Sequence, residues 1–515
     1  MQCYPIFSND NFLQLEQLSP LGLPILFDNL PTPTATNCPY HPATVDLPNP
    51  LPDSIINNVT LGLQMLKQNV LNSQTLPGIA YSLTYKDKVL FSGGLGVTVK
   101  NKNGEPNGTT IFRIGSVSKV FAVMVLYQLF DRGVVKSLDD DIKEYCPDFK
   151  MQTQYNITLR QLASQLSGLP REAPCGTHNN LTSFCATTTK NVLNNLQTER
   201  TLFPPWTRPS YSNLAYSLLG HCLVEHYSSS MTYEDYVQQN ILAPLKMSDT
   251  GFKITDTVKA RMATGYAPDG SVAPLTDLGW LAPAGQMYST TNDLNKLAQF
   301  FMDEYEPLKA VLSTSVRQQM LLPMFVNRDR LSGFGTPWEV LFQSNYTVLI
   351  KGGNVGGYTA LFSFIPELKL GLNVLLSGQA DEFGLAQVAH AMLIPVFVEA
   401  LRPLKTTFPY PPNPSVYEGT YKVEGDGIGQ LPNITIGTFN KHLVLSMFGV
   451  GYYLSYQDKY LFQIQYDDNL QPCLISELTA AKGEWLYFSP GKNNAPSPLF
   501  TIPGLYVGIN FVRIS

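Results

Sequence analysis

A serine and a lysine three residues apart stand where an apolar segment begins. Ser116 and Lys119 lead into residues 120–130, VFAVMVLYQLF, a run that is apolar on nearly every side and therefore typical of a buried helix. Residues three apart on a helix share a face, so the lysine amine can approach the serine hydroxyl. Burial favours the neutral amine, which can accept the serine proton, and the helix N-terminus favours negative charge near the serine. The alternative is an N-capping serine with a lysine that extends to solvent.

Two further segments carry polar groups suited to the same chemistry. Tyr211 and Asn213 precede an apolar helix pattern at 214–219, so a phenol and an amide at a helix start can both face one cleft. Lys351 opens the run KGGNVGGY shortly before strand-like residues. Glycines there, Gly353 among them, let a substrate approach the backbone of a sheet edge, and the lysine adds a positive charge. The alternative is that Tyr211 has only a packing role, with its aromatic ring filling space at the helix start.

The elements that must position these groups form an α/β chain, more closely α+β. Strand-like runs occur at both ends of the region, and residues 112–322 between them have a mostly helical pattern. We expect an antiparallel sheet flanked by helices with an inserted helical lobe, and a site between the two. The expected strands are 79–85, 89–91, 358–365 and 370–376, and the expected flanking helices are 53–72, with Asp53 as N-cap, and 382–401.

The last hundred residues differ in pattern from this region. Residues 403–414 are proline-rich and predict a stiff linker. Short β-like runs follow at 417–423, 443–447, 452–456, 460–465, 485–488 and 506–512, which indicates a small all-β domain of barrel type. We therefore expect four parts: an N-terminal extension (1–52), a catalytic-type domain (53–402), the linker (403–414) and a C-terminal β domain (415–515).

The order and separation of S-x-x-K, Y-x-N and K-x-G resemble those of the serine β-lactamase and penicillin-binding protein superfamily, most closely the class C β-lactamases and their animal relatives. The resemblance covers roughly residues 53–402, and the tail that begins YEGTY at Tyr417 is similar to a lipocalin-like domain that some relatives carry. Supporting stretches are LDDDI at 138–142, ITLRQL at 157–162, SGLP at 167–170 and PAGQMYST at 283–290.

The resemblance implies a role for each motif residue. Ser116 would form an acyl-enzyme while Lys119 and Tyr211 manage its proton, although which of them is the acylation base stays open. Asn213 would bind the substrate amide, and Lys351 would orient Tyr211 or a substrate carboxylate. The backbone N–H groups of Ser116 and Asn354 would form the oxyanion hole, with Gly353 lining the substrate path. No metal or cofactor is implied.

The function that follows is hydrolysis of an amide or ester bond in a small peptide, lactam or acylated metabolite. One departure bears on the substrate: Gly352 stands where bacterial relatives carry Thr or Ser, which removes a hydroxyl contact to a substrate carboxylate and puts β-lactam turnover in doubt. The six histidines lie outside the motifs and G-x-S-x-G is absent, so a Ser-His-Asp hydrolase is disfavoured. The alternative function is a catalytically silent binding or assembly protein that uses the same cleft.

Composition excludes several other classes. A net charge of −5 with no run of lysine or arginine argues against nucleic-acid binding, and no apolar run reaches the roughly 18 residues of a membrane span. The cysteines lack C-x-x-C spacing, which argues against zinc and redox sites. Cys175 and Cys185 could close a small loop and Cys3 could pair with Cys38, or the thiols could stay free. Sequons favour a secreted or luminal glycoprotein; they begin at Asn58, Asn107, Asn156, Asn180, Asn345 and Asn433.

Overall fold

The computed structural model describes residues 41–68, 76–102, 104–175, 184–304, 311–404, 407–425, 432–447, 450–465, 483–492 and 495–515. The chain divides into two compact units, Asp46–Phe397 and one that includes Val398–Ser515. Most of the expected N-terminal extension, including Cys3 and Cys38, lies outside the described residues.

The first unit is built on an open antiparallel sheet whose strands come from both ends of its sequence. The strand order is β2-β1-β10-β9-β8-β7-β6-β5, and each neighbouring pair is antiparallel. The predicted antiparallel sheet is confirmed, although the sequence pattern did not reveal β5 to β8. The strands are β1 (Gly78–Tyr85), β2 (Lys88–Gly96), β5 (Phe325–Val326), β6 (Ser332–Phe334), β7 (Glu339–Gln343), β8 (Tyr346–Val355), β9 (Tyr358–Ile365) and β10 (Leu370–Ser377).

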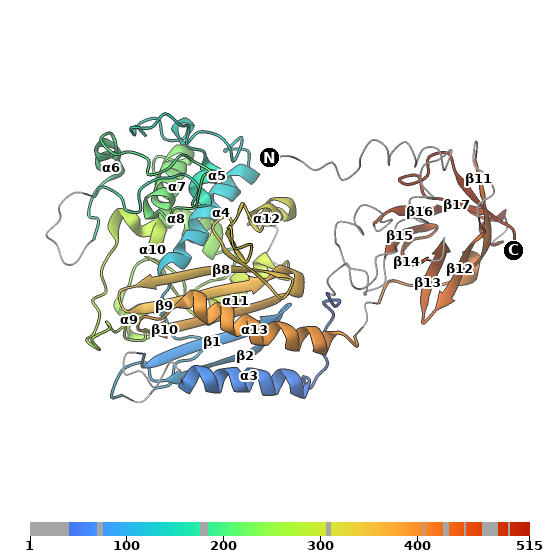
Figure 1. Ribbon diagram of the computed structural model, residues 1–515, viewed down its shortest axis with the longest axis horizontal. Helices are drawn as coiled ribbons and strands as arrows, with labels where there is room; N and C mark the ends of the chain where they lie inside the picture. Colours follow the sequence, from blue (N-terminus) through green and yellow to red (C-terminus); the bar gives the residue numbers. More distant parts are fainter. Residues whose placement is uncertain are drawn as a thin grey trace. The chain divides into compact units, whose positions relative to one another are not determined.

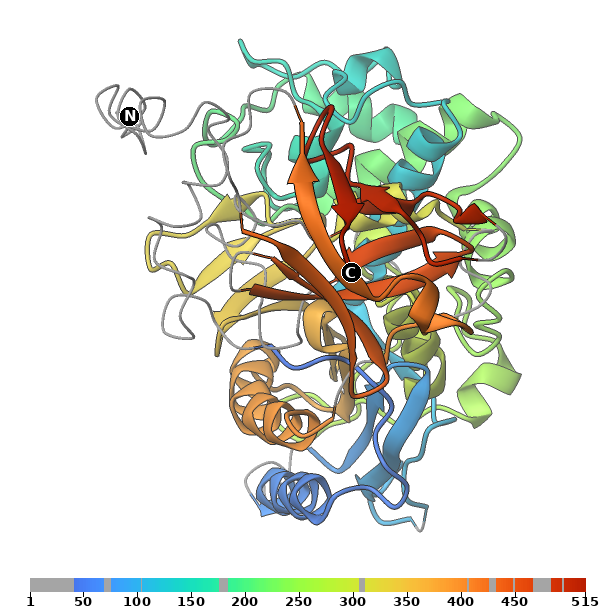
Figure 2. The same ribbon diagram turned by 90° about the vertical axis from the view of Figure 1, so that its right-hand side faces the viewer.

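Side chains of this sheet alternate between two faces that different helices cover. On one face, Ser82 of β1 and Asn373 of β10 donate hydrogen bonds to the side-chain oxygen of Asn295, at 2.6 and 2.8 Å. Asn295 belongs to α11 (Thr291–Phe301). On the other face, α3 (Asp53–Leu66) and α13 (Glu382–Leu401) lie side by side (Figures 1 and 2). The sheet is thus covered on both faces, as the sequence predicts.

Helix α13 agrees with the predicted bounds and packs one of its faces against the sheet. Among the described residues it is the one helix long and apolar enough to cross a membrane, with a mean hydropathy of 1.6 in its most apolar window. Its Phe397 ring lies 5.9 Å from the ring of Tyr85, and its His390 Nε2 lies 2.9 Å from Ser363 Oγ. Both partners are sheet residues, so one face of α13 packs on the sheet, and 39% of the most apolar window of the helix is buried.

The helical lobe surrounds one completely buried helix. Every residue of α4 (Ser118–Asp131) from Ser118 to Leu129 is buried, as its apolar sequence predicts, and α7 packs against it. Two disulfides cross this lobe: Cys146–Cys222, which the sequence did not indicate, and Cys175–Cys185, one of the expected pairings. The other helices are α5 (Leu159–Ala163), α6 (Thr189–Leu196), α7 (Asn213–Tyr227), α8 (Tyr233–Val237), α9 (Asp256–Ala260), α10 (Ala282–Gly285) and α12 (Thr314–Met320), and a two-stranded sheet joins β3 (Phe112–Arg113) to β4 (Tyr288–Ser289).

Polar caps fix where several of these helices begin. The Thr158 hydroxyl accepts the N–H of Gln161 while the Gln161 side chain accepts the N–H of Thr158, which forms a capping box. Ser212 caps α7 by accepting the N–H of Ala215. The expected cap at Asp53 is wrong: α3 begins at Asp53 itself, Pro52 precedes it, and no side-chain cap is formed. An aspartate in the first turn still favours the helix through its charge.

The second unit contains a closed antiparallel β-barrel, which confirms the barrel-like fold predicted for the tail. Figure 2 shows the strands of this barrel in orange to red. Its interior is aromatic: the Tyr417 ring lies 4.8 Å from that of Phe462, and the Phe500 ring stacks at 4.5 Å on that of Phe511. The strands in barrel order are β11 (Gly419–Glu424), β12 (Ile434–Phe439), β13 (His442–Met447), β14 (Val450–Asp458), β15 (Leu461–Gln465), β16 (Trp485–Phe488), β17 (Leu499–Thr501) and β18 (Asn510–Arg513).

Candidate active site

Ser116 lies in a 3₁₀ turn, Gly115–Val117, that leads directly into α4. Gly115 has a φ of +49°, a conformation that favours glycine. The turn and the first residues of α4 bring the Lys119 amine onto the serine, so that Lys119 Nζ donates to Ser116 Oγ at 3.0 Å. The alternative of a lysine that extends to solvent is therefore wrong, because Lys119 is completely buried.

The Lys119 amine is held by two further acceptors. It donates to Asn213 Oδ1 at 2.7 Å and to the carbonyl oxygen of Ala284 at 2.7 Å. Burial lowers the pKa of Lys119 below its ordinary value, because the ammonium form is the one that loses most by leaving water. Three converging contacts and a lowered pKa give a positioned amine with access to its neutral form.

Tyr211 approaches Ser116 from the other side. Its hydroxyl donates a short hydrogen bond to Ser116 Oγ, so the serine oxygen accepts from both the amine and the phenol. Lys119 Nζ lies 4.7 Å and Lys351 Nζ 5.5 Å from the centre of the Tyr211 ring. Burial alone would raise the pKa of Tyr211, but the two lysine charges outweigh it and lower that pKa. Less free energy is therefore needed to convert the phenol of Tyr211 to its phenolate than in an isolated tyrosine.

Lys351 lies inside strand β8, whereas the sequence pattern placed the strand only after it. Its amine forms an ion pair with Glu339 Oε1 at 2.5 Å and donates to the carbonyl oxygen of Gly352 at 2.9 Å. Burial by itself lowers the pKa of Lys351, but the Glu339 carboxylate reverses the effect and raises it. Lys351 is therefore a buried cation whose charge Glu339 balances.

The end of β8 forms an edge that faces the Ser116 turn. β7 pairs with β8 only as far as Ile350, so Lys351–Val355 are paired on one side alone, with β9. On the open side the N–H of Gly352 donates to Glu339 Oε2 at 3.3 Å. Since backbone donors alternate along a strand, the N–H of Asn354 points to the same open side.

Glycines bring this edge close to the nucleophile. A Cβ at Gly353 would lie 2.7 Å from the backbone nitrogen of Ser116, and a Cβ at Gly115 would lie 2.9 Å from the backbone nitrogen of Asn354. Both positions exclude larger residues because the neighbouring atoms are backbone. The backbone nitrogens of Ser116 and Asn354 therefore lie at one contact between the turn and β8.

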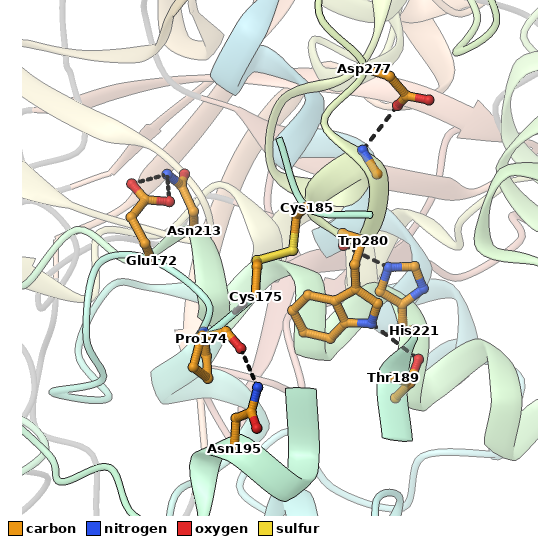
Figure 3. The surroundings of a disulfide bond; sticks show 11 residues. Glu172, Pro174, Cys175, Cys185, Thr189, Asn195, Asn213, His221, Asp277 and Trp280 are labelled. Carbon is orange, nitrogen blue, oxygen red and sulfur yellow. Dashed lines mark hydrogen bonds between the residues drawn. A yellow bond between two sulfur atoms is a disulfide. The ribbon is translucent and has the colours of Figure 1, made fainter. Parts of the chain in front are cut away.

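Asn213 is positioned by Glu172 and, through the chain, by a disulfide (Figure 3). Its Nδ2 donates to Glu172 Oε1 and Oε2 at 2.8 and 3.0 Å, which fixes its oxygen toward Lys119. Glu172 lies three residues before Cys175, and Cys175 is joined to Cys185. The carbonyl oxygen of Cys185 in turn accepts the N–H of Trp280 at 2.9 Å. The disulfide thus anchors the segment that holds Asn213.

The structure brings all the residues selected from the sequence to one place and adds three carboxylates that the sequence analysis missed. These are Glu172, Glu339 and Glu382. Glu339 faces Lys351 only because β7 pairs with β8 in a particular register, which no local pattern encodes. Glu172 follows the S-G-L-P stretch at 167–170 by two residues, and this proximity to a supporting stretch was the one available signal.

His221 and His390, two of the histidines that the structure describes, have partners outside this site. His221 stacks on Trp280, with ring centres 5.0 Å apart, and its Nε2 lies 2.8 Å from the carbonyl oxygen of that residue. Burial lowers the pKa of His221 to about 4 and that of His390 to about 4. Within the described ranges, no cluster of three or more His, Cys, Asp or Glu side chains is arranged to hold a metal ion.

Comparisons with known proteins point to one family. The family model for Beta-lactamase matches residues 64–394. The Homo sapiens protein beta-lactamase-like 1 is 34% identical over 505 residues, which cover 91% of this chain and 97% of that protein. Beta-lactamase-like protein 4 of Dictyostelium discoideum is 32% identical over 395 residues, which cover 71% of this chain and 68% of that protein.

Solved structures with low sequence identity share the fold. The octameric penicillin-binding protein homologue from Pyrococcus abyssi superposes with a TM-score of 0.57 at 19% identity, over 88% of this chain and 99% of that one. A class C beta-lactamase from Rhodobacter sphaeroides superposes with a TM-score of 0.55 at 19% identity, over 65% of this chain and 99% of that one.

Proposed function

The chain belongs to the beta-lactamase family, and from that premise we propose that it is a serine hydrolase that cleaves an amide or ester bond through an acyl-enzyme on Ser116. One observation carries the proposal: Ser116 Oγ accepts hydrogen bonds from both the Lys119 amine and the Tyr211 phenol. Both of these groups have a lowered pKa. A serine hydroxyl is a weak nucleophile unless such a base is in contact with it.

Acylation would begin with attack of Ser116 Oγ on the substrate carbonyl carbon. The serine proton passes to the Lys119–Tyr211 pair, which interacts strongly enough to titrate as a unit. The carbonyl oxygen becomes an oxyanion between the N–H groups of Ser116 and Asn354. Collapse of the tetrahedral intermediate breaks the bond to the leaving group, which takes the proton back from the pair.

Deacylation would repeat these steps with water in place of Ser116. Water loses a proton to the same pair, attacks the acyl carbon and releases Ser116 with its proton restored. Asn213 positions the Lys119 amine, which lies 2.7 Å from its Oδ1. Lys351 supplies the second positive charge near the Tyr211 ring. The proposed substrates are small peptides, lactams or acylated metabolites.

The proposal is tested by covalent labelling of the whole protein with a fluorophosphonate, followed by proteolysis and mass spectrometry. We expect one adduct, on Ser116, because among the serines that the structure describes this one combines a lysine amine, a phenol and two proposed backbone donors. An unlabelled or randomly labelled folded protein would overturn the proposal and favour the alternative of a silent binding protein.

Replacement of Tyr211 by phenylalanine keeps the ring and removes the hydroxyl. We expect the rate of Ser116 acylation to fall roughly 10²-fold, as is typical when one proton-transfer group is lost. In the wild type the rate should rise with pH and reach half its plateau below pH 10.0, the ordinary phenol value, since the pair must lose a proton before it can accept the one from Ser116. Labelling rates measured from pH 5 to pH 10 provide the check.

The matched control for this variant is Tyr216→Phe. Tyr216 is a second buried tyrosine near Lys119, with its ring centre 5.5 Å from the amine, but its hydroxyl donates to the carbonyl oxygen of Ala163 at 2.8 Å. Its loss should cost about 1 kcal/mol of stability and leave the labelling rate close to that of the wild type. Equal rates in Tyr211→Phe and Tyr216→Phe would remove Tyr211 from the proton pathway.

A further inference from the structure

The space beside Gly352 is filled by a carboxylate from a distant part of the chain. A Cβ built on Gly352 would lie 2.3 Å from Cγ and 2.8 Å from Oε1 of Glu382, the first residue of α13. The other carboxylate oxygen accepts a hydrogen bond from Asn354 Nδ2 at 2.6 Å. Thr359 Oγ1 donates to Asn354 Oδ1 at 2.6 Å, so Asn354 holds Glu382 in a fixed position.

This carboxylate lies beside the oxyanion-hole strand. The residue that contacts it, Asn354, carries one of the two proposed oxyanion donors on its backbone, and the residue it covers, Gly352, is two positions before it on β8. A substrate whose carbonyl oxygen lies between Ser116 and Asn354 must extend along or across this open edge. Whatever group extends past Gly352 therefore lies close to the Glu382 charge.

The cations near Glu382 are each in contact with another carboxylate, although the Glu382 charge also contributes to the raised pKa of Lys351. Lys351 is paired with Glu339 at 2.5 Å, and Arg171 lies 3.4 Å from Glu172. Among the residues that the structure describes, Glu382 forms no ion pair with a lysine or arginine. The part of the site along β8 is therefore negative on balance.

We propose that Glu382 determines the charge preference of this site, which takes amides or esters that carry a protonated amine on the part lying along β8 and rejects those that carry a carboxylate there. The inference rests on the proposed function, since it concerns the substrate of the same serine. Charges several ångströms apart near a protein surface change binding by roughly one to two powers of ten.

This preference adds a second effect to the absence of a Thr or Ser hydroxyl at position 352. Loss of a Thr or Ser at that position would only weaken a contact to a substrate carboxylate, whereas Glu382 fills the vacated space with like charge. Penicillins and cephalosporins carry a carboxylate beside the lactam ring. They are poor substrates by this argument, even though the groups around Ser116 are suited to acylation.

The test uses three matched phosphonate probes that share one leaving group and differ in one arm: 2-(trimethylammonio)ethyl, 3,3-dimethylbutyl and 3-carboxypropyl. For the wild-type protein we expect Ser116 to react with the cationic probe at least about tenfold faster than with its neutral isostere, and with the anionic probe at least about tenfold slower. In Glu382→Gln the ratio between cationic and anionic probes should shrink by about tenfold or more, and in Glu382→Lys the order should invert.

Asp381→Asn is the matched control. Asp381 is the adjacent carboxylate, exposed, and accepts the N–H of Gly384 at 3.0 Å, a contact that asparagine preserves. This variant should keep the wild-type order and spread. The proposal is overturned if the neutral probe labels Ser116 in the wild type and the charged probes show no order, or if Asp381→Asn changes the spread as much as Glu382→Gln. Failure of the neutral probe to label Ser116 would instead reject the proposed function.

Discussion

Replacement of Ser116 by alanine is expected to abolish covalent labelling and to lower turnover of any substrate by at least about 10³-fold. The reason is that Lys119 and Tyr211 both direct their donors at Ser116 Oγ, and among the described residues no other serine or threonine hydroxyl contacts both groups. The measurement compares the initial rate of hydrolysis and the mass of the labelled protein for the variant and the wild type.

Ser118→Ala is the control for this experiment. Ser118 is a buried serine two residues away, but its hydroxyl accepts the N–H of Met287 at 3.1 Å and so has a structural partner. Its loss should cost about 1 to 2 kcal/mol of stability while Ser116 is still labelled. If hydrolysis persists in Ser116→Ala and disappears in Ser118→Ala, then Ser118 and not Ser116 is the nucleophile.

Replacement of Lys119 by methionine is the second large effect that we expect. Methionine has a similar length and no proton to exchange, so acylation of Ser116 should slow by about 10³-fold or more, within the range for loss of a proton-transfer group. The thermal unfolding temperature should change little or rise, because a buried amine no longer has to leave water. Stopped-flow labelling and a melting curve measure the two quantities on the same preparation.

An arginine at the same position separates two roles for the lysine. Arg stays protonated at all accessible pH values and cannot accept a proton. If Lys119 acts as part of the base, Lys119→Arg should be as slow as Lys119→Met in a protein that still unfolds cooperatively. If only a positive charge is needed, the arginine variant should retain most of the labelling rate, which would contradict the proposed proton transfer.

The sequence predicted those parts of the molecule whose signals are local. The apolar run after Lys119 predicts α4 because a helix buried on all sides can be apolar on all sides. The strands at 358–365 and 370–376 and the helix at 382–401 agree with β9, β10 and α13 almost to the residue, since each has an uninterrupted apolar pattern bounded by turn residues. In the barrel, all six of the expected runs overlap a strand, namely β11, β13, β14, β15, β16 and β18.

The parts that the sequence did not predict depend on pairing over distance. β7 and the first half of β8 carry residue patterns too short to stand out, and they form strands because they pair with each other and with their neighbours β6 and β9. Glu339 and Glu382 reach the site through this sheet register and through the packing of α13 on it. The bond between Cys146 and Cys222 joins residues 76 apart, which seven cysteines alone could not specify.

The two disulfides also govern how the chain responds to a single proteolytic cut. Cys175–Cys185 lies within the interval that Cys146–Cys222 closes. A nick at any peptide bond in that interval therefore leaves two fragments that remain one covalent molecule, with Ser116 on the first and Lys351 on the second. The same nick in a reducing medium removes the covalent link, so that only the shared sheet and core still hold the nucleophile to the half of the site that carries Lys351.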